Sequence, residues 1–500
     1  MRSLSVVLLA VVLGLSTSSS AQQSGALGAA ADLLGASRIN TLQFTAAGAA
    51  YLLGQNYTAD EPWPPVLVRA HTVILDFTTA SMRQEQVRDQ SLQQPRGGGA
   101  AFNGQEQRVT QLVSGDVAWN LPAAAPAPAG GNAAPPQPAP APANQVERML
   151  AIWSTPQGFI KGALANKATS RRANAGTEVT FTVGGKYRLT GVINARNHVE
   201  RVQTRIDSPV VGDILIETEY RDYYDFGGVL FPMRITQKQD GRVTLDLVVA
   251  SATANPTVQI AVPDNVRTPA PAPAINVAVQ KVAEGVFHLT GGTHHSLAVE
   301  MRDHIVLFDT PNDERRGAAV IAKAKETIPG KPIRFIVTSH HHWDHLGGIR
   351  AAIDEGATIV THQSNKALIE RIAASRRTLN PDALEKSRRP LKLQLVGARE
   401  VLTDGQRTIE LHNLTNYRHA GDMLVMYLPA ERIIAEADVF TPPAMPTTPL
   451  NPVALPAVRT LVENVQRLGL NVQTIVPFHG GRTAEFAELT QRASATAATN

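Results

Sequence analysis

The chain has 500 residues, which is more than one hydrophobic core usually organises, so we expect at least two folded units joined by connectors. Its formal charge of +4 comes from 47 basic and 43 acidic residues without any basic block, which argues against nucleic acid as a partner. Cysteine is absent, so the sequence excludes disulfides, lipid attachment of the bacterial lipoprotein kind and thiolate metal ligands.

The first residues, MRSLSVVLLAVVLGLSTSSSAQQ, combine one positive charge, an apolar run from Leu4 to Leu15 and small residues that end at Ala21. This pattern is typical of a secretory signal peptide over residues 1–21, with an uncleaved anchor as the alternative. The run is shorter than the ~20 residues that span a bilayer, so we expect no integral membrane segment after cleavage. The predicted location is the bacterial periplasm or the outside of the cell.

Two stretches rich in alanine and proline divide the chain. Residues 121–144 and 267–274 alternate these residue types too densely for a helix or a strand ladder, so both should be extended and solvated. The second stretch predicts a linker over residues 263–276. The first predicts an insertion within an N-terminal domain that covers residues 25–262.

The N-terminal domain has the pattern of an antiparallel β meander. From residue 65 to 260, short runs alternate apolar and polar residues between turn signals, while residues 26–36 and 145–168 have helical patterns. We therefore expect a curved sheet with one or two helices across its concave face. The strand order and the final segment, FPMRITQKQDGRVTLDLVVASATAN, resemble the half-barrel of periplasmic lipoprotein carriers.

After residue 277 strands alternate with helices, which predicts α/β architecture with helices packed outside sheets. Of the 14 histidines, only His71 and His198 precede residue 280. Metal chemistry is therefore expected in this C-terminal unit, residues 277–495.

The segment VTSHHHWDHLGGIR, residues 337–350, gathers metal-binding side chains at one strand-to-helix junction. His340 and His342 can point to the same side, and Asp344 and His345 open the following helix. This spacing suits two neighbouring metal ions. Further donors stand at the ends of other predicted strands; they are His419, Asp438 and His479.

With these seven residues the C-terminal unit resembles the metallo-β-lactamase superfamily. The family motif His-x-His-x-Asp-His is matched by His340, His342, Asp344 and His345, and the three distant donors match the remaining ligand positions. The resemblance implies an αββα sandwich with the metals at one edge of its two sheets. It also implies two zinc ions: one held by His340, His342 and His419, the other by Asp344, His345 and His479, with Asp438 between them.

The function implied by the resemblance is an exported dinuclear zinc-dependent hydrolase. Zinc lowers the pKa of bound water to about 7, so a metal-bound hydroxide could attack an ester, thioester, lactone, lactam or phosphodiester. Asp344 is the expected catalytic residue, because it would orient the nucleophile as well as bind metal. The partner would be a small-molecule substrate.

Three more residues are candidates for support or substrate contact. Asp309 matches a family aspartate that props the metal loop through hydrogen bonds. His295, together with His294, occupies a loop that the family places near the metals. Tyr417 stands two residues before His419 and could contact an anionic substrate, although a solvated face explains it equally well. The alternative for His294 and His295 is that they are loop histidines bonded to backbone.

The residues also favour some branches of the superfamily over others. His342 stands where the di-iron flavoprotein branch has glutamate, and Asp438 favours the glyoxalase II, lactonase and phosphodiesterase side. Two alternatives stay open: an apolar-ligand or lipid-binding periplasmic protein with an inactive C-terminal domain, and a mononuclear iron dioxygenase on the same fold.

Overall fold

The computed structural model describes residues 17–90, 96–99, 106–123, 136–174, 176–269 and 274–494, with side chains from residue 25 onward. Residues 1–16 of the predicted signal peptide, residues 124–135 of the insertion and residues 270–273 of the linker lie outside this part. Within the described ranges, no helix combines the length and apolar character needed to cross a membrane.

The N-terminal domain is one large antiparallel sheet, as the sequence predicts. After α1 (Thr17–Leu33), thirteen strands pair in the order β6-β5-β4-β3-β2-β1-β13-β12-β11-β10-β9-β8-β7. Its first and last long strands, β1 and β13, therefore pair at the middle of the sheet. The strands are β1 (Thr41–Tyr51), β2 (Pro65–Asp76), β3 (Ser81–Gln90), β4 (Gln107–Ser114), β5 (Val117–Leu121), β6 (Ala139–Pro140), β7 (Thr169–Ala173), β8 (Gly176–Val183), β9 (Tyr187–Ile193), β10 (Val199–Ser208), β11 (Gly212–Asp225), β12 (Leu230–Gln239) and β13 (Arg242–Ala254).

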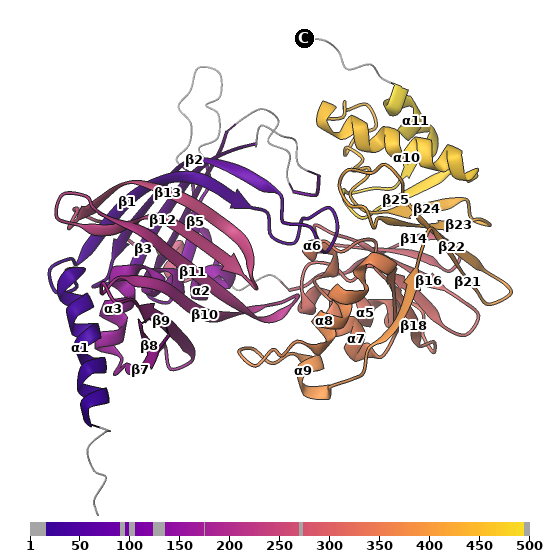
Figure 1. The fold of residues 1–500 in the computed structure, drawn as a ribbon. Coiled ribbons are helices and arrows are strands. Elements are labelled where there is room, and N and C mark those ends of the chain that lie inside the picture. The colour runs from indigo at the N-terminus through magenta and orange to yellow at the C-terminus, as the bar shows by residue number, and fades with distance from the viewer. Residues whose placement is uncertain are drawn as a thin grey trace, which may run out of the picture.

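The sheet curves around two helices, α2 (Gln145–Ser154) and α3 (Pro156–Ala165) (Figure 1). The sequence predicts a helical stretch here, and Pro156 divides it because the residue before a proline avoids helical backbone. Thr155 is extended, and its hydroxyl accepts a hydrogen bond from the Gly158 amide, which caps α3. Leu150 and Phe159 are buried against the sheet.

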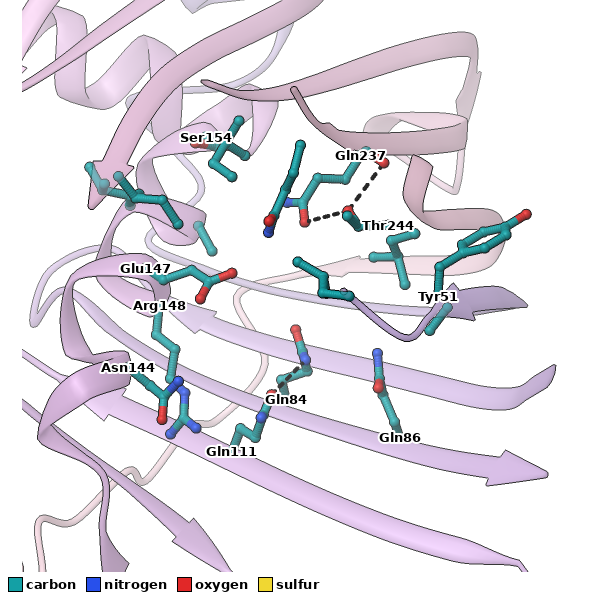
Figure 2. A pocket seen from close by; sticks show the side chains of 18 of the residues that line it. Tyr51, Gln84, Gln86, Gln111, Asn144, Glu147, Arg148, Ser154, Gln237 and Thr244 are labelled. Carbon is teal, nitrogen blue, oxygen red and sulfur yellow. Dashed lines mark hydrogen bonds between the residues drawn. The ribbon is translucent and has the colours of Figure 1, made fainter. Parts of the chain in front are cut away.

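A cavity of about 320 Å³ lies between α2 and the sheet (Figure 2). Figure 2 shows the side chains of Glu147, Gln84 and Gln237 directed into this space, with Gln84 bonded to Gln111. The surrounding protein raises the pKa of the Glu147 carboxyl above its ordinary value, although the neighbouring charge of Arg148 opposes the shift. The wall is thus mixed: glutamine side chains, Glu147 and Arg148 stand among apolar residues such as Leu52, Val66 and Leu150.

The C-terminal domain has the predicted αββα sandwich. One sheet has the order β14-β15-β16-β17-β18-β19-β20 and the other β21-β22-β23-β24-β25-β26. The first comprises β14 (Ala278–Ala283), β15 (Val286–Thr290), β16 (Ser296–Glu300), β17 (Ile305–Phe308), β18 (Ile333–Val337), β19 (Thr358–His362) and β20 (Lys392–Val396). The second comprises β21 (Arg399–Thr403), β22 (Thr408–Asn413), β23 (Leu424–Leu428), β24 (Ile433–Glu436), β25 (Thr474–Pro477) and β26 (Ala484–Glu485).

Strand residues of alternating parity fill the two faces of the first sheet. Leu307 and Ile336 belong to the core beneath the outer helices, whereas Phe308 and Val337 belong to the core between the sheets. The helices outside the first sheet are α5 (Glu314–Thr327), α7 (Ile349–Glu355) and α8 (Lys366–Ala374), and those outside the second are α10 (Leu455–Leu468) and α11 (Phe486–Ser494). Short helices α4 (Asp264–Arg267), α6 (Trp343–Leu346) and α9 (Ala383–Ser387) complete the fold.

Ion pairs and hydrogen bonds around the buried side chain of Arg377 join the two domains. Arg377, between α8 and α9, donates to both carboxylate oxygens of Asp207 at 2.6 and 2.9 Å, and to Glu314 at 2.8 Å. Thr378 donates to Asp213 through its amide and its hydroxyl, at 2.7 and 2.6 Å. Charge-assisted hydrogen bonds of this kind fix geometry, so the β10–β11 hairpin is held against the C-terminal domain.

One prediction concerns His71, which is buried in β2 beside Gln86 at 2.8 Å from Nδ1. Burial, reinforced by the charge of Arg88, lowers the pKa of His71 from 6.5 to about 4. Between pH 6.5 and about 4, His71 is protonated in the unfolded chain but neutral in the folded chain. The free energy of unfolding therefore decreases as the pH falls through this range. Between pH 7 and pH 4.5 the free energy of unfolding should fall by about 2 to 3 kcal/mol more for the wild type than for His71→Gln.

Chemical denaturation followed by circular dichroism at the two pH values measures this difference. His198→Gln is the control, because His198 is less enclosed and stacks on Tyr223 at 4.2 Å. Equal pH dependence of the wild type and His71→Gln would contradict the assignment.

Candidate metal centre

The candidate ligands all lie in loops that follow strands at one edge of the sandwich. His340 and His342 follow β18, Asp438 follows β24 and His479 follows β25. His419 lies in the loop between β22 and β23. The topology therefore gathers residues that are far apart in the sequence, and α6 adds Asp344 and His345 from the same strand end as His340.

Four of these side chains form a first group, His340, His342, His419 and Asp438, with one ligand atom of each within 4.8 Å of the others. The Nε2 atoms of His340 and His419 both lie 3.2 Å from Oδ2 of Asp438. Within the described part of the chain, four atoms of the group are buried without a hydrogen-bond partner; they are His340 Nε2, His342 Nδ1, His419 Nε2 and Asp438 Oδ2. Buried polar atoms are normally paired, so this convergence fits a divalent cation.

A second group adjoins the first and consists of His294, His345 and His479. The Nε2 atoms of His345 and His479 lie 3.3 Å apart. Asp438 reaches both of them, because its Oδ2 is 3.0 Å from His345 Nε2 and its Oδ1 is 2.7 Å from His479 Nε2. The Asp438 carboxylate therefore lies between the two groups, where a bridging ligand would stand.

Asp344 and His294 differ from the ligand set that the sequence suggests. Asp344 belongs to neither group: its Oδ1 accepts a hydrogen bond from Gln55 at 3.0 Å, and its Oδ2 lies 3.3 Å from His294 Nε2. His294 takes the place beside His345 and His479 that the sequence analysis gives to Asp344. Because His294 and His295 are adjacent at the start of β16, strand parity could have shown that only one of them faces the cluster.

His295 points to the other side and braces a neighbouring loop. Its amide donates to the Phe478 carbonyl at 2.9 Å, and its Nε2 donates to the Gly480 carbonyl at 2.6 Å. His479 lies between these two acceptors. His295 therefore fixes the backbone that presents His479.

Asp309 supports the site as the sequence suggests. Its Oδ2 accepts a hydrogen bond from His345 Nδ1 at 2.8 Å, and its two oxygens accept from the amide and hydroxyl of Ser339, each at 2.6 Å. The bond to Nδ1 leaves Nε2 of His345 facing the cluster. Asp309 and Asp438 both have left-handed backbone, with φ of 62° and 59°, a conformation that the surrounding bonds must hold in place.

The backbone around Asp438 is held by two buried side chains. The Tyr417 hydroxyl donates to the Asp438 carbonyl at 2.5 Å, and its ring stacks on His419 with centroids 5.6 Å apart. The Glu436 carboxyl accepts from the amides of Val439 and Phe440, and burial raises its pKa to about 8. Tyr417 is buried, and its hydroxyl bonds to the backbone of the shared carboxylate residue; a contact with substrate stays a prediction.

Burial controls the protonation of the cluster. It lowers the pKa of His340 and His342, and the positive charge of neighbouring histidines adds to this effect. Burial alone would raise the pKa of Asp438, but the surrounding imidazoles, His345 first, hold it well below its ordinary value. His345 differs from these two: against the effect of burial, the carboxylates of Asp438 and Asp309 raise its pKa well above the ordinary value, so a metal would have to displace a proton from its Nε2. His340 and His342 as neutral imidazoles, and Asp438 as a carboxylate, are already in the forms that bind metal.

His341 stands between two of the candidate ligands but points away from them. Its Nδ1 lies 2.8 Å from Asp422, whose other oxygen accepts from Asn365 at 2.6 Å. All three side chains are buried. The geometry therefore agrees with the predicted ligand set, which does not include His341.

The comparisons with known proteins concern the C-terminal part of the chain. No curated protein matches the sequence. Among similar solved structures, a metallo-beta-lactamase from Pontibacter korlensis has 19% sequence identity and a TM-score of 0.33, and the match covers 44% of this chain and 98% of that one. A metallo-beta-lactamase from Hirschia baltica has 23% identity and a TM-score of 0.31, with 43% and 96% covered. The metallo-beta-lactamase FIM-1 from Pseudomonas aeruginosa, in its mono-zinc form, has 21% identity and a TM-score of 0.31, with 43% and 93% covered. The family model of the metallo-beta-lactamase superfamily matches residues 289–479. Together with the αββα arrangement of this region, that match shows that the C-terminal domain has the metallo-β-lactamase fold.

Proposed function

We propose that the protein is an exported dinuclear zinc-dependent hydrolase that acts on a small molecule with an ester, thioester, lactone, lactam or phosphodiester bond. One observation carries the proposal: two adjoining groups of histidines share the Asp438 carboxylate, and four of the buried donor atoms have no hydrogen-bond partner. Imidazole and carboxylate are the ligands that zinc takes in the absence of cysteine.

The two groups divide the ligands between two ions. His340, His342 and His419 would hold the first, and His345 and His479 with His294 or Asp344 would hold the second, with Asp438 shared. Bound zinc supplies Lewis acidity and lowers the pKa of a coordinated water toward neutrality.

The protein's own contribution is to fix the state and orientation of these groups. Asp309 keeps Nδ1 of His345 protonated, so Nε2 is free to bind. Asp344 is the most exposed carboxylate of the cluster, at 38%, against 15% for Asp438. Although burial opposes ionisation, the hydrogen bond with His294 and the charge of His345 lower the pKa of Asp344, so it stays ionised and can orient a water molecule by accepting its proton in a hydrogen bond.

The rival function, carriage of an apolar ligand, gains little support from the N-terminal cavity. Its wall is partly apolar, but Glu147, Arg148 and Gln239 also line it, and a lipid chain placed against these groups would leave them without water. The iron dioxygenase alternative makes a separate prediction, because the purified protein would then contain iron and consume oxygen.

Metal analysis of single variants tests the assignment of the ligands. The wild type should carry about two zinc ions per chain, whereas His342→Ala or Asp438→Ala should lose metal and activity because each removes an atom that no other residue replaces. The N-terminal sheet should stay folded by circular dichroism. His362→Ala is the matched control, since the His362 ring bonds to Ser364 at 2.8 Å and lies outside both groups. Full turnover by metal-free wild type would refute the proposal.

A second prediction concerns the Asp309 support. Asp309→Asn should weaken zinc binding at the second group by roughly 10- to 100-fold, because the amide no longer offers His345 a charged acceptor. Competition with a chromogenic chelator measures the affinity. Asp303→Asn is the control, because Asp303 makes a similar bond to His304 at 2.7 Å on the surface. Equal zinc affinity of Asp309→Asn and Asp303→Asn would show that the support is dispensable.

The bond type needs a direct screen. Purified zinc-loaded protein should hydrolyse at least one class among lactams, lactones, thioesters and phosphodiesters, and the Asp438→Ala variant should not. Hydrolysis of none of these classes by protein that does hold zinc would leave the metal assignment intact and reject the proposed activity.

A further inference from the structure

Two segments of the N-terminal domain reach the metal centre. We call residues 54–57, between β1 and β2, the strap, and residues 96–99 the glycine segment. The strap touches three consecutive residues of the metal-binding loop, His342, Trp343 and Asp344, and it does so with three consecutive residues of its own. Because three consecutive residues are held, the strap fixes the direction of the metal-binding loop as well as its position.

The contact with His342 decides which ring nitrogen can bind a metal. Nε2 of His342 donates to the Asn56 carbonyl at 2.8 Å, so its Nδ1 is left as the unpaired atom that belongs to the first group. The carbonyl is itself held, because the Asn56 side chain donates to the carbonyls of Thr58 and Glu61 at 2.5 and 3.1 Å. A carbonyl partner on the far nitrogen fixes both the tautomer and the rotation of a ligating histidine.

The next two contacts hold the start of α6. The Trp343 amide donates to the Gly54 carbonyl at 3.3 Å, and the Trp343 ring packs edge-on against Trp63 at 5.8 Å. A Cβ atom on Gly54 would lie 2.2 Å from the Trp343 ring, so only glycine permits this approach. Gln55 then donates to Asp344 at 3.0 Å and sets the orientation of that carboxylate.

The same segments also hold the loop of His419. The Gly421 amide donates to the Tyr57 carbonyl at 2.8 Å, and the Gly97 amide donates to the Arg418 carbonyl at 2.9 Å. Gly98 lies closest to the cluster: a Cβ atom there would be 2.1 Å from Oε1 of Gln55 and 2.8 Å from Nδ1 of His342. Two of the three loops that supply ligands to the first group are therefore bound to the N-terminal domain.

We propose that the strap and the glycine segment are a structural part of the metal centre. Gln55 and Asn56 are positioning residues: the Asn56 carbonyl sets the tautomer of His342, and Gln55 sets the direction of Asp344. The N-terminal domain thereby determines how tightly the C-terminal domain binds metal. The inference rests on the proposed function only in taking zinc as the ion.

The test measures metal binding by full-length protein without reference to turnover. Metal is removed by dialysis against a chelator, zinc affinity is measured by competition, and cobalt is titrated while its visible absorption is recorded. Gly98→Ala should weaken the first zinc by roughly 10- to 100-fold and change the cobalt spectrum, because its methyl group displaces the His342 ring. Gln55→Ala removes the bond to Asp344, and Asn56→Ala removes the side-chain bonds that hold the Asn56 carbonyl in place. Each variant should weaken zinc binding several-fold and change the cobalt spectrum in the same experiment.

Two variants control for general damage. Gly397→Ala adds a methyl group where the nearest atom is 3.9 Å away, and Gln111→Ala removes a glutamine whose partner is Gln84 in the N-terminal sheet. Both should bind zinc and cobalt as the wild type does. If Gly98→Ala fails to fold, Gln55→Ala and Asn56→Ala decide the result.

The outcomes separate this inference from the proposed function. A wild type that binds zinc tightly, with Gln55→Ala and Asn56→Ala equal to it in affinity and in cobalt spectrum, would overturn the role of the strap and leave the hydrolase proposal standing. A wild type that binds neither ion would overturn both.

Discussion

The buried carboxylate of Asp438 is the centre around which the C-terminal domain is organised. Four imidazoles direct Nε2 atoms at its two oxygens, at distances from 2.7 to 3.2 Å. An ionised carboxylate in such a place is costly unless positive charge surrounds it. Its backbone is left-handed, and Tyr417 and Glu436 hold that conformation through bonds to the carbonyl and the following amides. The two cores of the sandwich bring three separate segments of the chain to this one group: the one after β18, the β22–β23 loop and the one after β25.

The N-terminal domain is part of this arrangement and is not an independent attachment. It contacts the metal loop at one place and the α8–α9 segment at another, through Arg377 and Asp207. Two separated contacts prevent the hinge motion that a single contact would allow. The segment that leads into the strap also lines the cavity between α2 and the sheet, through Tyr51, Leu52 and Leu53. One stretch of chain therefore borders both the cavity and the metal-binding loop.

Much of the fold follows from the sequence because strand alternation and turn signals are local properties. The predicted meander and sandwich are confirmed, but β1 lies before the predicted strands, β3 lacks their alternation, and β6 pairs with β5 within the Ala/Pro-rich stretch where no ladder was expected. β1 reads TLQFTAAGAAY, where alanine and glycine weaken the alternation, and β3 reads SMRQEQVRDQ, whose polar side chains face the cavity or solvent. Local pattern thus fails where the inner face of a sheet is itself polar or small.

For the site, the motif and the strand ends identify the residues that converge, but not their detailed roles. His294 and His295 immediately precede β16, and only His294 faces His345. Which of the two adjacent side chains faces the cluster depends on the path of the backbone into the strand. The strap is further from prediction, since Asn56 lies 286 residues before the histidine whose tautomer it sets. A backbone carbonyl carries no sequence signal, so only the assembled structure reveals that contact.

The hydrogen bond from His342 to the strap has a thermodynamic corollary. Free-energy coupling between two events is reciprocal, so whatever the docked strap adds to metal affinity, the bound ion must return as extra cohesion between the domains. Loading with metal should then protect the junction from proteolysis, and loosening the junction should release metal. Occupancy of the centre would report, in effect, whether the two halves of the molecule are correctly assembled.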